Sequence, residues 1–381
     1  MTDDPPPHPA LLPAGLRDLL PPDAETEAAA VEGLMDTFAA HGYQRVKPPL
    51  LEFEESLLAG TGAAVADQTF RLMDPETRRM MGLRADITPQ VARIATTRLA
   101  QLARPLRLSY AGQCLRVQGT QIAPDRQVAQ VGIELIGHDS PDADAEIVLV
   151  AAEALARLGL TRLSYDLTMP PLIPTLLDEA GIEPVQRAAL ARALDRKDAA
   201  AVQARGGALA GTLTGLLLAA GPARRALQAL AAAALTPLAR LHAERLAATV
   251  AAIQARAPDL TLTVDPVEFR GFRYHTGVSL SVYATGRHEE LGRGGRYVCG
   301  EAEPATGVTL YPDVVLRAMP ARAGRSRLYL PPGTDPARAA ALRAEGFATV
   351  AGFEPGDALV VARALGCTHV LSGGSPVAVA E

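Results

Sequence analysis

Two long runs with strand-like alternation, separated by a turn-rich segment, constrain this chain more than any other part of it. The runs cover Leu106 to Val117 and Gln127 to Ile136, and the segment between them, 119–125, is rich in turn-forming residues. Because side chains alternate between the two faces of a strand, apolar residues at every second position indicate antiparallel strands. We expect a long hairpin with a bulge or register shift near Gly112, around which the rest of the chain is organised.

Polar residues interrupt these apolar strands at mostly even intervals. Arg126, Gln130 and Glu134 fall on one face of the second strand, and Arg116 ends the first. Arginine binds carboxylate or phosphate groups through two hydrogen bonds, and glutamate accepts hydrogen bonds from an ammonium group or a ring N–H. Such a face suits a small zwitterionic or phosphorylated ligand, and a solvated hairpin face is the alternative.

Composition narrows the functional class. A chain of 381 residues is long enough for two or three domains. A formal net charge of −5, no tryptophan and only 4% aromatic residues argue against a nucleic-acid-binding protein. The three cysteines are far apart and odd in number, which suits a reducing cytosol and gives no zinc spacing. The seven histidines form no metal-binding pattern, so we expect neither a metal nor a cofactor.

No apolar run approaches 18 residues, and the N-terminus is acidic and proline-rich. We therefore expect neither a membrane span nor a signal peptide, and a cytoplasmic protein. Residues 1–10 are predicted to be a disordered tail.

A helix followed by an irregular strand is predicted near the N-terminus. Ala24 to His41 has helical spacing, and Gly42 ends it. Tyr43 to Phe53 reads as a strand, but the pair Pro48-Pro49 removes two backbone donors from it. The strand is expected to be irregular, or to lie at an edge or an interface. A long helix that leads into an edge strand is a common dimer surface, and an edge without a partner explains the pattern equally well.

A second hairpin and a helix precede the long hairpin. The hairpin strands are predicted over Thr69–Met73 and Met80–Asp86. Thr88 is expected to cap a helix that begins at Pro89 and runs to about residue 102. Asp86 lies near the positive end of this helix, and a capping role alone would explain it.

The C-terminal half changes character twice. Residues 170–257 are rich in alanine, leucine and arginine and are predicted to form an inserted helical subdomain, whereas 258–320 returns to strand patterns. Gly292, Gly294 and Gly295 permit close approach of backbone or ligand, but they lack the strand–loop–helix context of a nucleotide-binding loop. Residues 325–381 alternate between strand and helix patterns, which predicts a small α/β unit.

Several of these segments, in this order, resemble a known family. LRADITPQ (83–90), the hairpin that carries Arg116 and Glu134, FRGFRYHTG (269–277) and GRGGRY (292–297) resemble the catalytic core of class II histidyl-tRNA synthetases over residues 11–318. The resemblance implies an α+β fold, in which helices flank an antiparallel sheet. The core domain would then comprise residues 11–169 and 258–320.

Departures from the synthetase pattern point to a paralogue. Val314 stands where the synthetase has an arginine that clamps ATP, and Val298 replaces an aspartate. Residues 325–381 are too few for the synthetase's anticodon-binding domain. These losses resemble the regulatory subunit of the short-form ATP phosphoribosyltransferase, which is not itself an enzyme. The resemblance implies that the chain binds and activates the short catalytic subunit in the first step of histidine biosynthesis and helps to confer feedback inhibition by histidine. It also implies a self-dimer within a hetero-octamer of four regulatory and four catalytic chains.

The same resemblance implies a histidine-binding site. Asp86, Thr88 and Gln130 match the positions that hold the amino group of histidine, and an ammonium group is well matched by a carboxylate and neutral acceptors. Glu134 matches the residue that binds the imidazole N–H, and His275 falls where the synthetase has a second such residue, a tyrosine. Groups left unpaired when a wrong amino acid binds would supply the discrimination.

The remaining positions of this site follow in the same way. Tyr110 and Tyr274 would line the pocket, and Arg270 would face the ligand carboxylate. Arg116 matches the arginine at the ATP α-phosphate, and without its partner at 314 we expect it to belong to a vestigial nucleotide site. A buried ion pair between Arg270 and Glu134 is the alternative, because either charge needs a partner when buried.

Two questions stay open in the sequence. The chain could be a histidyl-tRNA synthetase with a degenerate third motif, or another enzyme that forms aminoacyl adenylates. A tRNA-sensing kinase module is excluded because it needs a basic surface and a kinase domain. Histidine could also act at a subunit interface, with the synthetase-like pocket kept only as scaffold.

Overall fold

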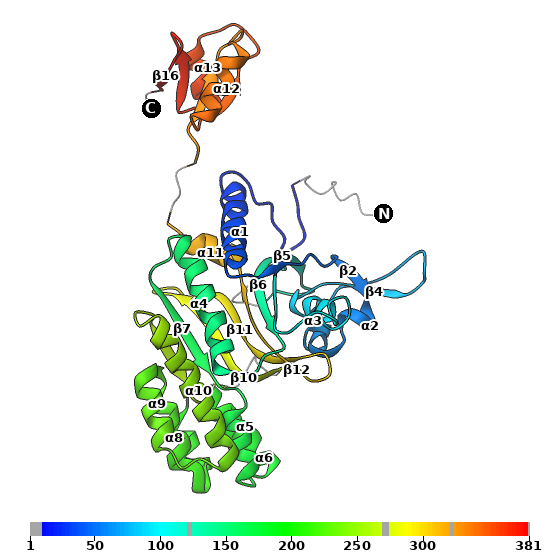
Figure 1. Cartoon of the computed structure of the whole chain (residues 1–381), viewed down its shortest axis with the longest axis vertical. Coiled ribbons are helices and arrows are strands. Elements are labelled where there is room, and N and C mark those ends of the chain that lie inside the picture. The colour runs from blue at the N-terminus through cyan, green and yellow to red at the C-terminus, as the bar shows by residue number, and fades with distance from the viewer. Residues whose placement is uncertain (1–9, 120–123, 269–273, 321–323, 380–381) are drawn as a thin grey trace, which may run out of the picture. The chain divides into compact units, whose positions relative to one another are not determined.

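The computed structural model describes residues 10–119, 124–268, 274–320 and 324–379. The chain divides into two compact units, residues 1–320 and 321–381 (Figure 1). The tail predicted over 1–10 lies outside the described residues except for Ala10.

The first unit mixes helices and strands throughout its length. Its helices are α1 (Asp23–Ala40), α2 (Glu54–Leu57), η1 (Gly60–Gln68), α3 (Thr88–Thr96), α4 (Pro141–Arg157), α5 (Leu172–Glu179), α6 (Pro184–Asp195), α7 (Ala199–Arg205), η2 (Gly207–Leu209), α8 (Ala210–Ala219), α9 (Ala223–Ala232), α10 (Pro237–Arg256) and α11 (Pro312–Ala318). Its strands are β1 (Gln44–Arg45), β2 (Leu51–Phe53), β3 (Arg71–Met73), β4 (Met80–Leu83), β5 (Leu106–Leu115), β6 (Gln127–Ile136), β7 (Leu163–Thr168), β8 (Gly221–Pro222), β9 (Leu262–Asp265), β10 (His275–Ala284), β11 (Glu290–Cys299) and β12 (Glu303–Leu310).

A nine-stranded sheet organises this unit, in the order β1-β5-β6-β12-β11-β10-β7-β9-β8. The six strands from β5 to β7 in that order are all antiparallel to their neighbours. The parallel pairs lie toward the edges, where β1 joins β5 and β9 joins β7. The predicted α+β fold, an antiparallel sheet flanked by helices, is confirmed.

The long hairpin of β5 and β6 forms as predicted, except at Gly112. The register is continuous from Leu106 opposite Ile136 to Leu115 opposite Gln127, so the shift predicted near Gly112 is wrong. The glycine has a different cause. A Cβ atom there would meet the guanidinium of Arg84, which crosses the strand at this point. The residue is glycine because another side chain passes close to the backbone.

One face of the sheet is covered by α1, α4, α10 and α11, which build the larger hydrophobic core. The start of α4 is well specified by the sequence. The hydroxyl of Ser140 accepts a hydrogen bond from the N–H of Ala143 at 3.1 Å, and Pro141 occupies the first turn. Apolar residues of α4, including Ile147 and Leu155, are fully or almost fully buried against the sheet.

The opposite face is only partly covered. Helix α3 packs there with Ile87, Val91 and Tyr110 in a second, smaller cluster of buried residues. The rest of this face holds polar side chains and glycines, and it carries the pocket described below.

The segment predicted as a strand over Tyr43–Phe53 is broken into β1 and β2. The prolines between them are held by side chains, since the carbonyl of Pro48 accepts from Arg84 at 3.1 Å and that of Pro49 from Gln90 at 2.8 Å. The segment is irregular, as the two prolines indicated. Strand β2 then joins a small sheet in the order β2-β4-β3.

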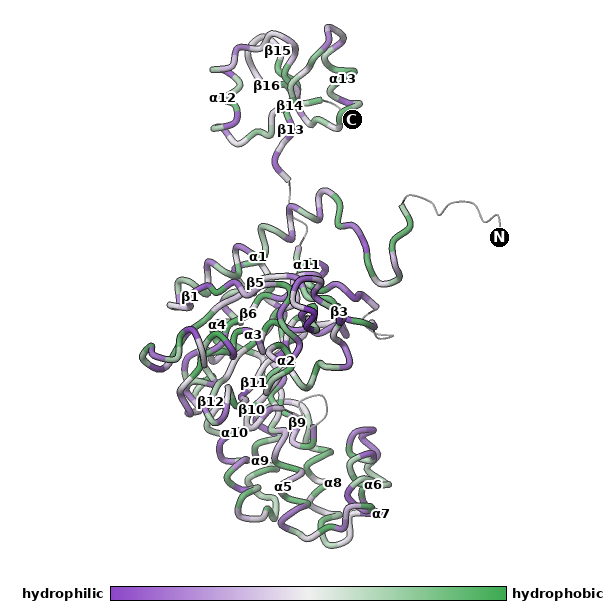
Figure 2. Tube along the Cα trace, turned by 90° about the vertical axis from the view of Figure 1, so that its right-hand side faces the viewer, coloured by the Kyte–Doolittle hydropathy of each residue, from purple (hydrophilic) through white to green (hydrophobic). Residues whose placement is uncertain are grey.

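Helices α5 to α10 lie between β7 and β9 in the sequence. In Figure 2 hydrophobic residues recur along α5 and α8, and Leu176, Leu213 and Leu216 from these helices are buried. Helix α10 packs along α4 and so joins this helical region to the core of the first unit. The region is almost strandless, with the two residues of β8 as the exception.

The second unit is a small α/β structure. It contains β13 (Arg327–Leu330), α12 (Pro336–Ala344), β14 (Ala348–Ala351), α13 (Ala358–Ala364), β15 (His369–Ser372) and β16 (Ser375–Ala378), with the sheet order β14-β13-β15-β16. Asp335 and Asp357 cap the two helices by accepting hydrogen bonds from backbone N–H groups of the first turn.

Candidate functional site

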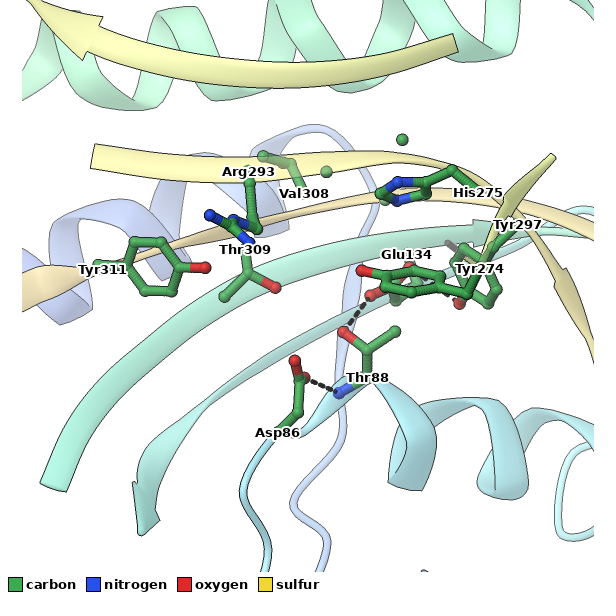
Figure 3. A pocket seen from close by; sticks show the side chains of 13 residues that line it. Asp86, Thr88, Glu134, Tyr274, His275, Arg293, Tyr297, Val308, Thr309 and Tyr311 are labelled. Atoms are coloured by element: carbon green, nitrogen blue, oxygen red, sulfur yellow. Dashed lines mark hydrogen bonds between the residues drawn. The ribbon is translucent and has the colours of Figure 1, made fainter. Parts of the chain in front are cut away.

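A pocket lies on the partly covered face of the sheet, over β6, β11 and β12 and beside the start of α3. The empty space within it, counted together with its opening to solvent, is about 330 Å³. Figure 3 shows the side chains around it. The lining residues are Asp86, Thr88, Glu134, Tyr274, His275, Arg293, Gly294, Gly295, Tyr297, Gly307, Val308, Thr309 and Tyr311.

Glu134 lies at the buried end of the pocket. Its carboxylate accepts hydrogen bonds from Thr88 at 3.1 Å, Tyr110 at 3.3 Å and Tyr297 at 3.0 Å. Burial raises the pKa of Glu134 to about 8, because the charged form loses its hydration, although these hydroxyl groups favour the carboxylate. In the empty pocket at neutral pH, the group is therefore mostly protonated. A ligand that brings a positive charge or an N–H donor would stabilise the carboxylate.

Asp86 and Thr88 enter the pocket from the start of α3. The N–H of Thr88 donates to the carboxylate of Asp86 at 2.9 Å. Asp86 thus binds one of the backbone N–H groups at the helix start that have no acceptor within the helix. The prediction that Thr88 caps the helix with its side chain is wrong. Its hydroxyl points across the pocket to Glu134 instead, and the helix begins at Thr88 and ends at Thr96. The buried carboxyl group of Glu134 needs hydrogen-bond donors, so the Thr88 hydroxyl donates to it and does not cap the helix.

Tyr274 and His275 form an aromatic wall. Their ring centroids are 4.3 Å apart, and the edge of Tyr274 also faces Tyr297. His275 is 7% exposed, and burial together with the charge of Arg293 lowers the pKa of its imidazole to about 3. His275 is thus neutral at physiological pH, as the hydroxyl of a tyrosine would be.

Two other predicted site residues, Tyr110 and Gln130, are buried near the pocket without lining it. The hydroxyl of Tyr110 is fully buried and lies 2.7 Å from that of Thr309. The amide oxygen of Gln130 accepts from the backbone N–H of Ile87 at 3.0 Å, and the thiol of Cys114 donates to it. Neither Tyr110 nor Gln130 is among the lining residues. The oxygen expected to bind an amino group is in fact used to hold the start of α3.

Of the two predicted arginines, one is outside the described residues and one is away from the pocket. Arg270 falls in 269–273, so neither its expected contact with a ligand nor an ion pair with Glu134 is described. Arg116 follows β5, where its backbone N–H donates to the carbonyl of Arg126 at 2.7 Å. Arg126 in turn donates to backbone carbonyls, including that of Ala14. These arginines of the hairpin do not line the pocket.

Five lining side chains were not predicted: Arg293, Tyr297, Val308, Thr309 and Tyr311. They come from β11, from β12 and from the residue that follows β12. The glycines of these strands marked the segment in the sequence but did not indicate which side chains face the pocket. Gly307 lies directly opposite Glu134, and a Cβ atom there would collide with the glutamate carboxylate. Strict alternation along these strands was the available signal.

Val314 takes part in packing. It lies in the first turn of α11 and packs against the larger hydrophobic core, and it is not among the residues that line the pocket. The preceding Asp313 accepts a hydrogen bond from the N–H of Ala129 at 3.0 Å.

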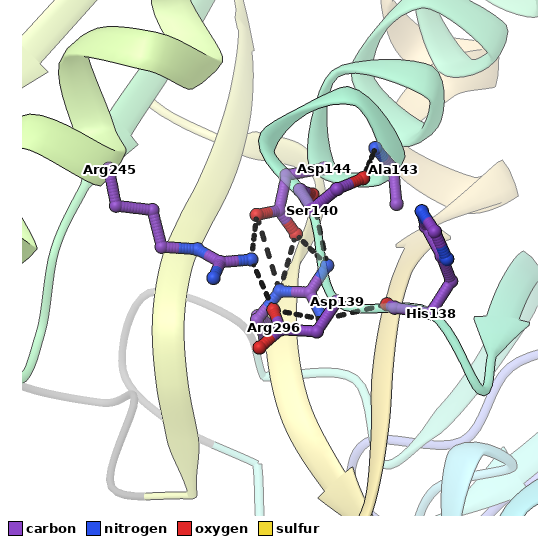
Figure 4. A network of polar contacts seen from close by, with 7 residues as sticks. All are labelled: His138, Asp139, Ser140, Ala143, Asp144, Arg245 and Arg296. Atoms are coloured by element: carbon purple, nitrogen blue, oxygen red, sulfur yellow. Dashed lines mark hydrogen bonds and ion pairs between the residues drawn. The ribbon is translucent and has the colours of Figure 1, made fainter.

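Behind the pocket lies a buried ionic network (Figure 4). Arg296 and Asp144 are each 4% exposed, and their side chains form an ion pair at 2.8 Å. The same aspartate receives Arg245 from α10 at 3.2 Å, and Asp139 contacts both arginines. The network joins β11, α4 and the helical region. Because Arg296 lies between two lining residues, it links the pocket strand to the helices on the other face.

Among the described residues no group of three or more histidine, cysteine, aspartate or glutamate side chains is placed to hold a metal ion. No helix in the described part of the chain combines the length and the apolar character needed to cross a bilayer.

The fold is that of the histidyl-tRNA synthetase class. The family model described as histidyl-tRNA synthetase matches residues 15–315. The histidyl-tRNA synthetase from Nostoc sp. PCC 7120 superposes with a TM-score of 0.78 at 16% identity, covering 94% of this chain and 90% of that one. A Bacillus halodurans protein described as an ATP phosphoribosyltransferase regulatory subunit/histidyl-tRNA synthetase superposes with a TM-score of 0.77 at 24% identity, over 93% of this chain and 96% of its own.

Relatives with higher identity define the family within this class. The ATP phosphoribosyltransferase regulatory subunit of Paramagnetospirillum magneticum is 56% identical over 363 residues, which is 95% of this chain and 96% of the relative. The protein of the same name from Rhodospirillum centenum is 55% identical over 377 residues, 98% of each chain. The chain belongs to the family of ATP phosphoribosyltransferase regulatory subunits.

Proposed function

We propose that this chain is a non-catalytic subunit that binds the short-form catalytic subunit of ATP phosphoribosyltransferase, activates it, and transmits feedback inhibition by histidine. The observation that carries the proposal is the contrast between the two parts of the synthetase-like site. The amino-acid pocket keeps a buried glutamate with three hydroxyl donors, whereas Val314, which the sequence resemblance matches to the ATP-binding arginine, packs against the larger hydrophobic core.

Each part of a histidine molecule has a counterpart in the pocket. The imidazole N–H is placed against Glu134, beside the touching rings of Tyr274 and Tyr297. The amino group is placed against Asp86, with the hydroxyl of Thr88 as a further acceptor. A buried carboxylate and a neutral aromatic wall select for an aromatic ring that bears an N–H donor.

Adenylate formation is not expected. Synthetase chemistry is largely positioning and charge stabilisation of ATP, so an apolar residue in place of a clamping arginine removes transition-state stabilisation. Of the two arginines that the synthetase uses to bind ATP, only Arg116 has a counterpart here. It follows β5 and does not line the pocket. We expect no histidine-dependent exchange of pyrophosphate into ATP.

The chain is proposed to form a self-dimer within a hetero-octamer of four regulatory and four catalytic chains. The small sheet β2-β4-β3 and the turn before it expose apolar side chains at Leu50, Met73 and Met80. These fit the interface predicted for the helix and proline-containing segment. Sedimentation of the chain alone tests the dimer, and sedimentation with the catalytic subunit tests the stoichiometry.

The first experiment measures the condensation of ATP with phosphoribosyl pyrophosphate by the matching short catalytic subunit, with and without this chain and with and without histidine. Activation that histidine then suppresses is the expected result. No effect of the chain on the rate would overturn the proposal, and pyrophosphate exchange would then be the activity to measure.

A matched pair of variants locates the effector site. Glu134→Gln is expected to leave activation intact and to weaken suppression by histidine, whereas Glu153→Gln, on the exposed side of α4, is expected to leave both unchanged. Histidine suppression that is the same in both variants would move the effector site from this pocket to a subunit interface.

A further inference from the structure

The two ends of the pocket differ in charge. Glu134, Tyr274 and Tyr297 surround the buried end, while Arg293 and Tyr311 stand at the other end in Figure 3. Among the described lining residues, Arg293 is the only side chain with a fixed positive charge. Its side chain is 43% exposed, which places it at the mouth.

The sheet register fixes the separation of the two charged residues. Glu134 pairs with Gly307 of β12, and Gly307 pairs with Gly295 of β11. Arg293 lies two residues from Gly295 along the same strand, so its side chain starts from the same face. Two inter-strand steps of about 4.8 Å and one side-chain repeat of about 6.7 Å put the Cα atoms of Glu134 and Arg293 roughly 12 Å apart.

That span suits one amino acid with a polar ring. The side chains of Glu134 and Arg293 rise from the same face of the sheet, and the glycines between them add no side-chain atoms. Asp86 lies to one side of the line that joins them, where Figure 3 shows its carboxylate below the space between Thr309 and Glu134. Along the pocket, Glu134 therefore comes first as acceptor for the ring N–H. Asp86 follows as acceptor for the ammonium group, and the guanidinium of Arg293 comes last.

Arg293 is held in place by a neighbour on its own strand. Its Nε and Nη2 atoms donate to one oxygen of Glu290 at 2.8 and 2.5 Å, and the other oxygen of Glu290 accepts from Ser281. A guanidinium group has five N–H donors, so the ion pair with Glu290 and a ligand carboxylate can be bound at the same time. Anchoring by Glu290 reduces the side-chain entropy lost on binding.

We propose that Arg293 binds the carboxylate group of the amino acid in this pocket and so distinguishes an intact amino acid from analogues without that group. The proposal rests on the proposed function, because it assumes that histidine occupies the pocket. A carboxylate needs such a partner because its transfer out of water is unfavourable when it is unpaired. The role expected for Arg270 from the sequence would then be shared with a residue that lies on a regular strand.

The test compares histidine with L-histidinol, in which a hydroxymethyl group replaces the carboxylate, by calorimetric titration of the full chain. The unmodified protein is expected to bind histidine about 10- to 100-fold more tightly than histidinol. This is the factor expected when a hydrogen bond to a charged group is lost. In Arg293→Met the two affinities are expected to become nearly equal, because only histidine loses a partner. Arg293→Lys should restore part of the difference.

The control is Arg317→Met, which removes an arginine of similar exposure, paired with Glu289. It should leave both affinities unchanged, and thermal melting should show that all variants are folded. A loss of the same factor for histidine and histidinol in Arg293→Met would overturn the proposal, because it would indicate a general effect on the pocket. If the unmodified protein bound neither ligand, this proposal and the placing of histidine in this pocket would both be wrong, whereas the proposed function is tested separately by the activation of the catalytic subunit.

Discussion

The buried side chain of Glu134 should make the free energy of unfolding depend on pH. The substitution Glu134→Gln should remove this dependence. Burial raises the pKa of Glu134 to about 8 from its ordinary value of 4.5. Between these two values the native state binds more protons at this site than the unfolded state does. The free energy of unfolding therefore decreases as pH rises, because ionisation of the unfolded chain is easier. Glu134→Gln removes this titration and keeps the shape of the side chain.

A suitable window is set by the neighbouring histidine. The pKa of His275 is lowered to about 3 in the native state, whereas it is about 6.5 in the unfolded chain. Its contribution to the free energy of unfolding is therefore fully present above pH 6.5 and no longer changes there. From pH 6.5 to 8 the changing contribution is that of Glu134. One pKa unit corresponds to 1.36 kcal/mol, so 1.5 units correspond to about 2 kcal/mol. Other titrating groups are common to both proteins and cancel in the difference.

The assay is urea unfolding of the wild-type protein and Glu134→Gln at several values between pH 6.5 and 8. The wild type is expected to lose about 2 kcal/mol of stability relative to the variant across this window. Glu153→Gln, whose carboxylate is half exposed, should follow the wild-type curve. Parallel curves for the wild type and Glu134→Gln would refute the reasoning, since they would place the glutamate pKa close to its ordinary value.

Further outcomes follow from packing and charge. Asp144→Asn should destabilise the protein by about 3–5 kcal/mol in urea unfolding, because it leaves a buried arginine without its partner, whereas Asp142→Asn at an exposed pair should cost less than about 1 kcal/mol. Gly307→Ala should abolish histidine binding in calorimetry, since its Cβ would collide with the buried carboxylate, while Gly211→Ala, in open space on a helix, should bind normally. Removal of 321–381 should leave histidine affinity unchanged, because every described lining residue lies in the first unit; a large loss of affinity in the folded fragment would contradict this.

Sequence patterns predicted the sheet well because its strands are amphipathic. The strand over 127–136 was located with its ends correct, and Glu134 was identified because a charged residue interrupts an apolar alternation. The two adjacent prolines also indicated correctly that the segment around Pro49 is irregular. These features depend on local backbone geometry, which the sequence encodes directly.

The rest of the site depends on which segments meet, and local patterns do not determine this. Arg293 lies on a strand whose pocket face is partly glycine and Tyr311 follows the end of another, so alternation was the available signal but did not single out either residue. Thr88 was predicted as a cap because its partner, a carboxylate 46 residues away, is invisible in the local sequence. Gln130 was predicted to hold the amino group of histidine, but it does not line the pocket and its amide oxygen accepts from a backbone N–H. Tertiary contacts override local preferences in both cases.

The glycines under the pocket limit how this site can evolve. A side chain at Gly132 would collide with Tyr110, and one at Gly307 would collide with Glu134, so the floor tolerates no gradual enlargement of side chains. Substitutions that leave the strands in place are therefore confined to exposed lining residues such as Arg293. New ligand preferences in descendants of this protein should arise from such substitutions, while the floor stays under purifying selection.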